Sequence, residues 1–185
     1  PDRLQRERRT PGPPSIDRAP DECEAERYQT MFANTPGSVA APTAGLDFEN
    51  DLLTALQARV VKSTTLTLYV GAGTFQPMRS DSIEQHVMHS EWLSVGQETI
   101  DRIAQTRARG GRVIAVGTTV VRALESALVN GVLQPFEGET RLFIYPGYRI
   151  RSGDALLTNF HSPGSAWLML VLSFCGPRAV PPAAP

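Results

Sequence analysis

The apolar and polar positions of the chain alternate between strand-like and helix-like spacing. Near-alternating or continuously apolar runs predict strands, and they cover Thr67–Val70 and residues 112–117, 141–145 and 155–160. Stripes at helical spacing predict helices, and they cover residues 24–32, 47–60, 100–110 and 118–130. Residues 165–174 are apolar all round, which predicts a helix buried in the core or against a missing partner, and in this chain alone we expect its apolar face from Leu168 to Phe174 to be exposed. Strands that alternate with helices in this way are typical of an α/β fold with a largely parallel sheet.

The two ends of the chain lack this pattern. Residues 1–23 are rich in arginine and proline and have almost no periodic apolar content, so we expect a disordered arm. Residues 177–185 form a Pro/Ala-rich tail that cannot continue a helix. The domain is therefore expected over residues 24–176.

Composition narrows the class of protein. With 185 residues the chain can form one domain, and its net charge of −1 leaves no basic footprint over the whole chain for nucleic acid. Cys23 and Cys175 have no framework spacing, which favours a reducing compartment. The N-terminus has no apolar signal core, and the longest apolar run, residues 166–172, is too short to span a bilayer. We expect a cytoplasmic location.

The stretch from Leu68 to Trp92 concentrates groups that bind anions or move protons. A predicted strand runs into a tight loop that holds Gly71, Gly73 and Thr74. Glycines two residues apart allow backbone N–H groups to converge on an anion, and the threonine adds a hydroxyl. A plain tight turn explains the same pattern equally well, because an isolated G-x-G is weak evidence.

His86, His89 and Glu91 follow this loop and allow three interpretations. On a helix the two histidines share a face at i and i+3, which suits a metal, although a third strong ligand nearby is missing and zinc is not favoured. In an extended segment His89 and Glu91 share a face instead, which suits an oriented acid–base pair. The third interpretation is surface or capping histidines. A capping pattern after Pro77 predicts a short helix that ends near His86.

A second anion site is predicted where the strand 112–117 meets the next helix. Gly117, Thr118 and Thr119 begin that helix, whose N-terminus presents free N–H groups and a partial positive charge. Arg122 and Glu125 lie off the predicted core stripe at i and i+3. They form either a surface ion pair of little energy or, for Arg122, part of the anion site.

Five blocks of the sequence resemble, in order and spacing, the S-adenosylmethionine:tRNA ribosyltransferase-isomerase family of queuosine biosynthesis. The resemblance runs from about Tyr28 to Phe174 and covers about the second half of such an enzyme. The blocks are YQTMFANTPGSVAAPTAGLDF, LYVGAGTFQPMRSDSIEQHVMHSE, GGRVIAVGTTVVRALESA, LFIYPGYRI and DALLTNFHSPGS.

The resemblance implies a partial large α/β domain, with a largely parallel sheet or an open barrel and surrounding helices. It implies transfer of the ribosyl part of S-adenosylmethionine, the co-substrate, to an aminomethyl-deazaguanine base in a tRNA anticodon, giving epoxyqueuosine without a metal. Such chemistry needs a base and an acid, and the groups that match are His86, His89, Glu91 and His161. The residues expected to bind substrate are Gly71, Gly73, Thr74, Gly117, Thr118, Thr119, Arg122, Glu125 and Asn159.

The chain departs from the family pattern at several positions. The family usually has histidine where this chain has Asp47 and Tyr69, and serine where it has Val120. After Gly176 the family pattern gives way to PRAVPPAAP. These departures suggest a fragment or a frame-disrupted copy. The alternatives are a non-catalytic remnant, a nucleotide- or RNA-binding α/β module, and a generic phosphate-binding α/β enzyme.

Overall fold

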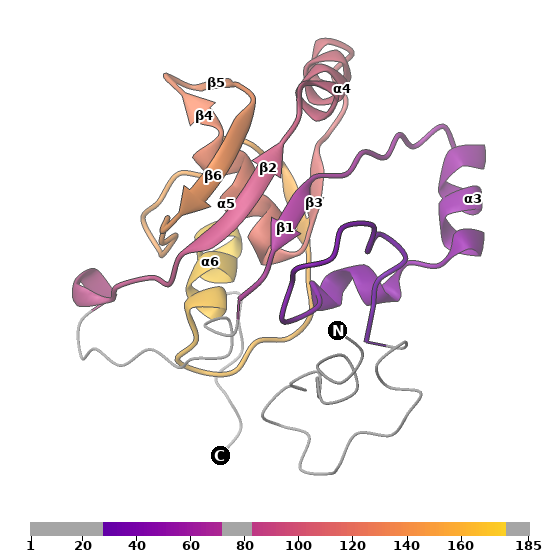
Figure 1. The fold of residues 1–185 in the computed structure, drawn as a ribbon. Coiled ribbons are helices and arrows are strands. Elements are labelled where there is room, and N and C mark those ends of the chain that lie inside the picture. The colour runs from indigo at the N-terminus through magenta and orange to yellow at the C-terminus, as the bar shows by residue number, and fades with distance from the viewer. Residues whose placement is uncertain (1–27, 72–82, 177–185) are drawn as a thin grey trace.

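A computed structural model describes residues 28–71 and 83–176 of the chain (Figure 1). The expected arm of residues 1–23 and the tail of residues 177–185 lie outside the described residues. The strands are β1 (Thr67–Tyr69), β2 (Glu91–Val95), β3 (Ile114–Val116), β4 (Leu128–Val129), β5 (Val132–Leu133), β6 (Phe136–Thr140) and β7 (Ala155–Leu157). The helices are α3 (Asn50–Ala58), α4 (Gln97–Ala108), α5 (Thr118–Ser126) and α6 (Ala166–Cys175), with 3₁₀ turns η1 (Thr43–Asp47) and η3 (Ile83–Gln85). The expected α/β class is confirmed.

Three strands form an antiparallel sheet in the order β1-β2-β6. The central strand β2 was not predicted, although its sequence EWLSV alternates: Glu91, Leu93 and Val95 are buried, and the two residues between them are half-buried. Tyr69 on β1 lies opposite Trp92 on β2, and their rings meet edge to face with centroids 4.9 Å apart. This sheet therefore turns one side of β2, including the carboxylate of Glu91, toward the interior.

The expected parallel arrangement holds for only one pair of strands in the described part of the chain. β3 and β7 pair in parallel, with Ala115 opposite Leu156. The expectation is wrong for the strand that begins at Thr67, because β1 is antiparallel to β2. Alternation of side chains is the same in both kinds of ladder, so the apolar pattern could not decide the direction of pairing.

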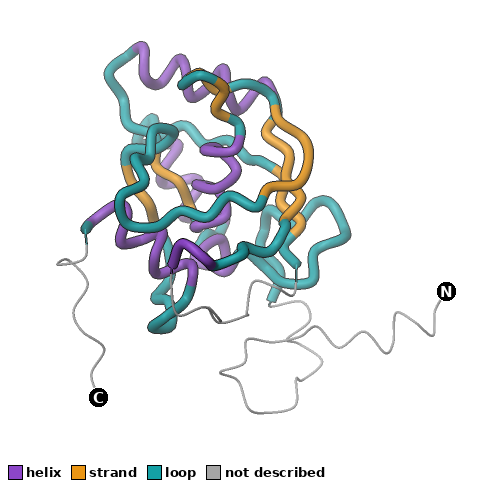
Figure 2. The backbone as a smooth tube through the Cα atoms, turned by 90° about the vertical axis from the view of Figure 1, so that its left-hand side faces the viewer, coloured by secondary structure: helices purple, strands orange, loops and turns teal. Residues whose placement is uncertain are grey.

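Helix α5 lies between the β1-β2-β6 sheet and the β3-β7 pair, and Figure 2 shows helical segments in the centre with strands on either side. One apolar cluster joins Ala123, Leu124 and Ala127 at the carboxyl end of α5 to Leu93 and Val95 of β2 and to Ile100 and Ile103 of α4. A second cluster joins Val121 of α5 to Ala115 of β3, to Ile144 in the segment between β6 and β7, and to Leu170 of α6. Because α5 packs on both sides, four of its polar residues are buried as well: Thr118, Thr119, Arg122 and Glu125.

In the first half of the described chain one expected helix end is absent, and the helix expected over residues 47–60 is present as α3 but differs in its cap and its burial. Residues 28–33 form turns, not the end of a helix. Asp47 ends η1 and does not cap the next helix, which begins at Asn50 after Glu49 as its N-cap residue. The stripe expected on α3 buries none of that helix's residues, because α3 stands apart from the sheets (Figure 1). Helical periodicity shows an apolar face but not whether a surface is present to cover it.

Three further boundaries also differ from the prediction. Asn130 and Gly131 do not end a helix: with φ values of 52° and 82° they turn the chain between the antiparallel strands β4 and β5, as Asn-Gly does in tight hairpins. Residues 141–145 form no strand, since β6 ends at Thr140. The strand expected over residues 155–160 ends at Leu157.

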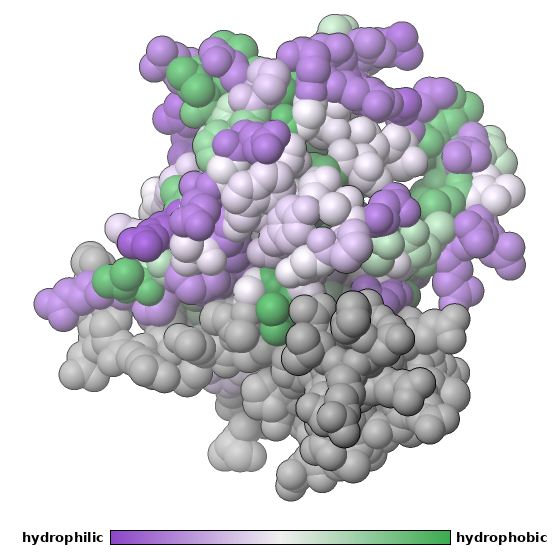
Figure 3. Space-filling view, viewed as in Figure 1, coloured by the Kyte–Doolittle hydropathy of each residue, from purple (hydrophilic) through white to green (hydrophobic). Residues whose placement is uncertain are grey.

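Apolar side chains are exposed in places other than the one expected. The last helix was expected to be apolar all round, and α6 is, but its residues from Leu168 to Phe174 are buried or half-buried. Exposed groups lie over α3 and the β4–β5 hairpin, at the right and upper left of Figure 3; they include Leu52, Val129 and Val132. Within the described residues, no helix has the length and apolar character needed to cross a membrane.

Candidate active site

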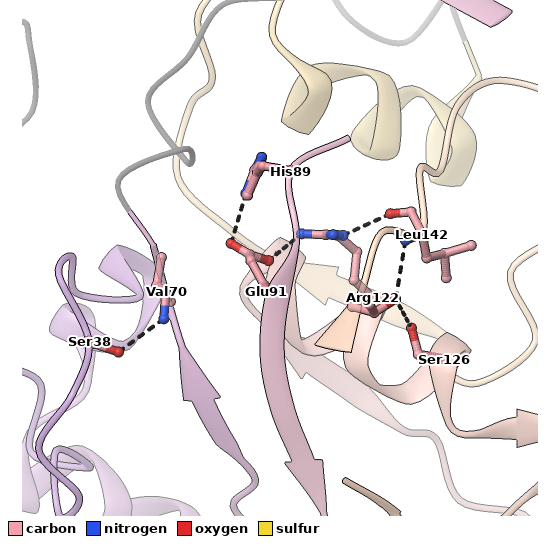
Figure 4. Close-up of polar contacts among 8 residues, drawn as sticks. Ser38, Val70, His89, Glu91, Arg122, Ser126 and Leu142 are labelled. Atoms are coloured by element: carbon pink, nitrogen blue, oxygen red, sulfur yellow. Dashed lines mark hydrogen bonds and ion pairs between the residues drawn. The ribbon is translucent and has the colours of Figure 1, made fainter. Parts of the chain in front are cut away.

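A buried ion pair joins the antiparallel sheet to α5. Glu91, the first residue of β2, pairs through Oε2 with Nη1 of Arg122 on α5, and both side chains are 1% exposed. The other carboxylate oxygen, Oε1, lies 3.1 Å from Nε2 of His89, whose side chain is 22% exposed (Figure 4). Strand alternation places Glu91 inward, and two residues earlier the same alternation places His89 beside it. The extended interpretation of these two residues therefore describes their geometry.

Arg122 is held at several points. Its Nε donates to the carbonyl oxygen of Leu142 at 2.9 Å, and its guanidinium lies 5.4 Å from the ring centroid of Trp167 on α6, within cation–π range. Its Nη2 is buried without a hydrogen-bond partner among the described residues. Burial lowers the pKa of Arg122, and the charge and hydrogen bond of Glu91 oppose that shift. The guanidinium stays protonated, because arginine keeps its proton in proteins.

Of the two alternatives for Arg122 and Glu125, the surface ion pair is wrong, since both side chains are buried and have different partners. Glu125 binds the segment that leads to β7. Its Oε1 accepts from the backbone N–H groups of Arg151 and Ser152 at 2.8 and 2.7 Å and from Ser152 Oγ at 2.6 Å, and its Oε2 accepts from Tyr148 at 3.0 Å. The predicted core stripe of this helix left Arg122 and Glu125 on the surface, whereas α5 is covered on both sides and both residues are buried.

The second predicted anion site lies where β3 and β7 end. Gly117 adopts a φ of 96°, a conformation that favours glycine, and its N–H donates to Leu157 at 2.8 Å. Thr118 and Thr119 follow as the buried first residues of α5. A Cβ at Gly117 would lie 3.8 Å from Ala44, so η1 passes close to this strand end. Carboxyl ends of parallel strands are the usual edge for ligands in α/β sheets.

Asn159 and His161, which were predicted as site residues, lie just after the end of β7, and Asn159 contacts Asp47, one of the positions that depart from the family pattern. Nδ2 of Asn159 donates to Oδ2 of Asp47 at 3.3 Å. His161 hydrogen-bonds Thr158 at 3.1 Å, and burial lowers its pKa. The structure therefore groups Asn159 and His161 with the end of β7, whereas His89 and Glu91 lie at the start of β2.

The remaining predicted residues divide between the described and undescribed parts of the chain. The ring of His86 packs edge to face on Phe143 at 4.9 Å, and its pKa is lowered by burial and, to a lesser extent, by the charge of His89. Gly71 follows β1, but Gly73 and Thr74 lie outside the described residues. Within residues 28–71 and 83–176, which the structure describes, no group of three His, Cys, Asp or Glu side chains is placed to hold a metal.

Sequence reasoning missed Trp167, whose ring lies 5.9 Å from that of His89 and also faces Arg122. Trp167 stands near the start of an apolar helix that Ser165 caps by accepting from the N–H of Leu168 at 3.2 Å. An aromatic residue in an apolar helix reads as core, so its pattern held no signal for a role beside a charged pair.

Comparison with known proteins agrees along nearly the whole chain. A family model described as queuosine biosynthesis protein matches residues 2–183. A Xylella fastidiosa (strain 9a5c) protein named S-adenosylmethionine:tRNA ribosyltransferase-isomerase is 62% identical over 166 residues, which are 90% of this chain and 48% of that relative. A Stenotrophomonas maltophilia (strain R551-3) protein of the same name is 58% identical over 172 residues, 93% of this chain and 50% of that relative.

A solved structure also matches. The crystal structure of S-adenosylmethionine tRNA ribosyltransferase from Thermotoga maritima superposes with a TM-score of 0.58 at 38% identity, and the match covers 72% of this chain and 41% of that chain. The chain thus spans about half the length of the curated relatives it matches.

Proposed function

We propose, from the premise that this chain belongs to the queuosine biosynthesis protein family, that the protein takes part in transfer and isomerisation of the ribosyl group of S-adenosylmethionine onto a tRNA base. The relatives carry that activity in their names. We extend the proposal to the aminomethyl-deazaguanine base of an anticodon as the acceptor, epoxyqueuosine as the product and the cytoplasm as the location.

The observation that supports the catalytic part is the hydrogen bond between His89 and Glu91, at 3.1 Å. Removal of a proton from carbon needs a base within reach of the substrate, and an imidazole oriented by a carboxylate is such a base. His89 is the partly exposed member of the group, while Glu91 is buried. His161, at the end of β7, is the further proton-transfer group in this proposal; its lowered pKa favours the neutral imidazole.

The substrate side of the proposal uses the two glycine-threonine segments. Gly71, Gly73 and Thr74 follow β1, and Gly117, Thr118 and Thr119 begin α5. Backbone N–H groups at such places suit the carboxylate or ribose of S-adenosylmethionine or a phosphate of the RNA. Asn159 adds an amide at the same strand edge as Thr118. Arg122 and Glu125 are buried and engaged, so we assign them to holding the site and not to contacting substrate.

The test is release of adenine from S-adenosylmethionine in the presence of a tRNA that carries the aminomethyl-deazaguanine base but has not yet received the ribosyl group. Because the chain spans about half of its relatives, the protein to assay is a full-length one in which this chain replaces the matching segment of the Xylella fastidiosa relative. We expect tRNA-dependent adenine release above that of a sample without enzyme. A folded hybrid that releases no adenine would contradict the proposal and favour the non-catalytic remnant.

The 185-residue chain alone provides the complementary measurement. We expect no adenine release from it, since short sheets with exposed apolar residues such as Ile114 and Leu157 are a small scaffold for a tRNA substrate. Turnover by the chain alone would show that the described residues, with the short segments beside them, suffice for the reaction.

A further inference from the structure

We propose that Arg122 is a positioning residue: by holding Glu91 it sets the tautomer of His89, so that Nδ1 of His89 accepts the proton from the substrate. The inference rests on the proposed function and adds to it the reacting atom and the residues that prepare it. It uses the chain of contacts from Leu142 through Arg122 and Glu91 to His89 (Figure 4).

The hydrogen bond between His89 and Glu91 fixes which ring nitrogen of His89 carries the hydrogen. An ionised carboxylate only accepts hydrogen bonds, so the hydrogen in this 3.1 Å contact belongs to Nε2 of the imidazole. A neutral imidazole carries one hydrogen, and Nδ1 then keeps its lone pair. In Figure 4 the second ring nitrogen lies on the side away from Glu91. The free base is therefore at Nδ1.

Arg122 keeps Glu91 charged and oriented. A buried carboxylate without a cation would take up a proton and could then donate to His89 instead of accepting. Arg122 prevents this through its Nη1, which takes Oε2 and leaves Oε1 for His89. Arg122 itself is fixed by Leu142 at 2.9 Å and by the face of Trp167. The carboxylate thus has one orientation.

Of the three side chains, that of His89 is the one open to a substrate. The side chains of Arg122 and Glu91 are each 1% exposed, whereas that of His89 is 22% exposed. A substrate can reach the imidazole but not the ion pair behind it. Among the described residues, the charged or titratable groups around His89 are Glu91 on β2, Arg122 on α5 and His86 on its own segment, and the α6 neighbour is the uncharged ring of Trp167.

The proton-transfer step balances with these groups alone. A C–H bond beside the sulfonium of S-adenosylmethionine breaks, its electron pair stays on the carbon, and the proton forms an N–H bond at Nδ1. The resulting imidazolium carries hydrogens on both nitrogens, and its Nε2–H remains on Glu91. A carboxylate beside an imidazolium stabilises the charge that forms in the step.

The tautomer can be read without any turnover, by nitrogen-15 NMR of histidine side chains in the 185-residue chain at a pH where His89 is neutral. In the wild-type chain we expect hydrogen on Nε2 of His89. In the double variant Glu91→Leu, Arg122→Met we expect a mixture of both tautomers, because the acceptor is gone. That variant replaces a buried ion pair by apolar residues of similar volume, which proteins commonly tolerate, so the test does not depend on the less stable single variants.

Arg122→Lys and Arg102→Met complete the series. Arg102 also lies on a helix with a carboxylate partner, Glu98, but that pair is exposed, so its variant should match the wild type. A lysine can hold Glu91 but cannot also reach Leu142 with a planar fork, so Arg122→Lys should be intermediate. Hydrogen on Nδ1 of His89 in the wild type, or unchanged tautomers in the double variant, would overturn the inference.

The kinetic arm uses the full-length hybrid. We expect Arg122→Met to lower kcat roughly tenfold or more with little change in KM, because a proton transfer is made only in the transition state. Arg122→Lys should recover part of the loss, and Arg102→Met should keep the wild-type rate. Equal changes in kcat for Arg122→Met and Arg102→Met would overturn the positioning role. A hybrid without any turnover but with the expected tautomers would count against the proposed function and not against the Nε2–H assignment.

Discussion

Ser152 binds Glu125 twice, because its backbone N–H and its hydroxyl both donate to Oε1, at 2.7 and 2.6 Å. Arg151 and Tyr148 donate to the same carboxylate. One buried side chain of α5 thereby holds the segment that leads into β7, while Arg122, one turn earlier on the helix, holds β2. The two charged residues of α5 therefore have different partners: Glu125 holds the loop before β7, and Arg122 holds Glu91 in the candidate site.

We predict that Glu125→Ala lowers the free energy of unfolding by roughly 3 kcal/mol, because it leaves several buried donors without an acceptor. Denaturant unfolding of the 185-residue chain measures the change. Glu98→Ala is the control: Glu98 is 77% exposed, and removing a surface pair changes stability by at most about 1 kcal/mol. Equal effects of the two substitutions would contradict a structural role for Glu125.

The hydroxyl of Tyr148 should make stability depend on alkaline pH. Burial, together with Glu125, raises the pKa of Tyr148 to about 12, from 10.0. The neutral phenol is favoured by the folded state, so this contribution is complete below pH 10 and is lost as the pH rises from about 10 to 12. In Tyr148→Phe this loss should be absent, which unfolding curves across that range would show.

Gly117 should tolerate substitution poorly. It precedes α5 with φ 96° and ψ 143°, and an alanine there would adopt a strained backbone that costs of the order of 1–3 kcal/mol. Gly96 provides the matched control, because it precedes α4 in the same way but with φ −80° and ψ 162°, which any residue adopts. We expect Gly96→Ala to change stability by less than about 1 kcal/mol. Thermal or denaturant unfolding of both variants decides whether the conformation of Gly117 matters.

In the full-length hybrid, His89→Ala should lower kcat for adenine release about a hundredfold or more, as loss of a general base does. Val87→Ala, a change two residues away at a side chain that is 80% exposed, should leave kcat unchanged. KM for S-adenosylmethionine should change little in either variant. Full activity of His89→Ala would remove this histidine from the mechanism.

The apolar pattern was sufficient for elements whose cause is local. The helix of residues 97–108 and its stop near Gly110 were expected, because an amphipathic stripe and a glycine C-cap act within a few residues. The strands around Ile114 and Leu156 were expected for a similar reason, because each is a short apolar run between turn signals; their parallel pairing was expected from the alternation of strands and helices and is confirmed. The Asn-Gly hairpin had its own local signal too, and assigning it to a helix end was an error of interpretation.

The sequence by itself determined the α/β class and the family resemblance, and it offered the pairing of His89 with Glu91 on one face of an extended segment as one of three interpretations, among which the structure decided. Only the tertiary structure decided the direction of β1, the two-sided burial of α5 and the choice of Glu91 as the partner of Arg122. The physical reason is that periodicity describes which side of an element is apolar, whereas a buried charge selects its partner across 31 positions of the chain, by packing that no local pattern encodes.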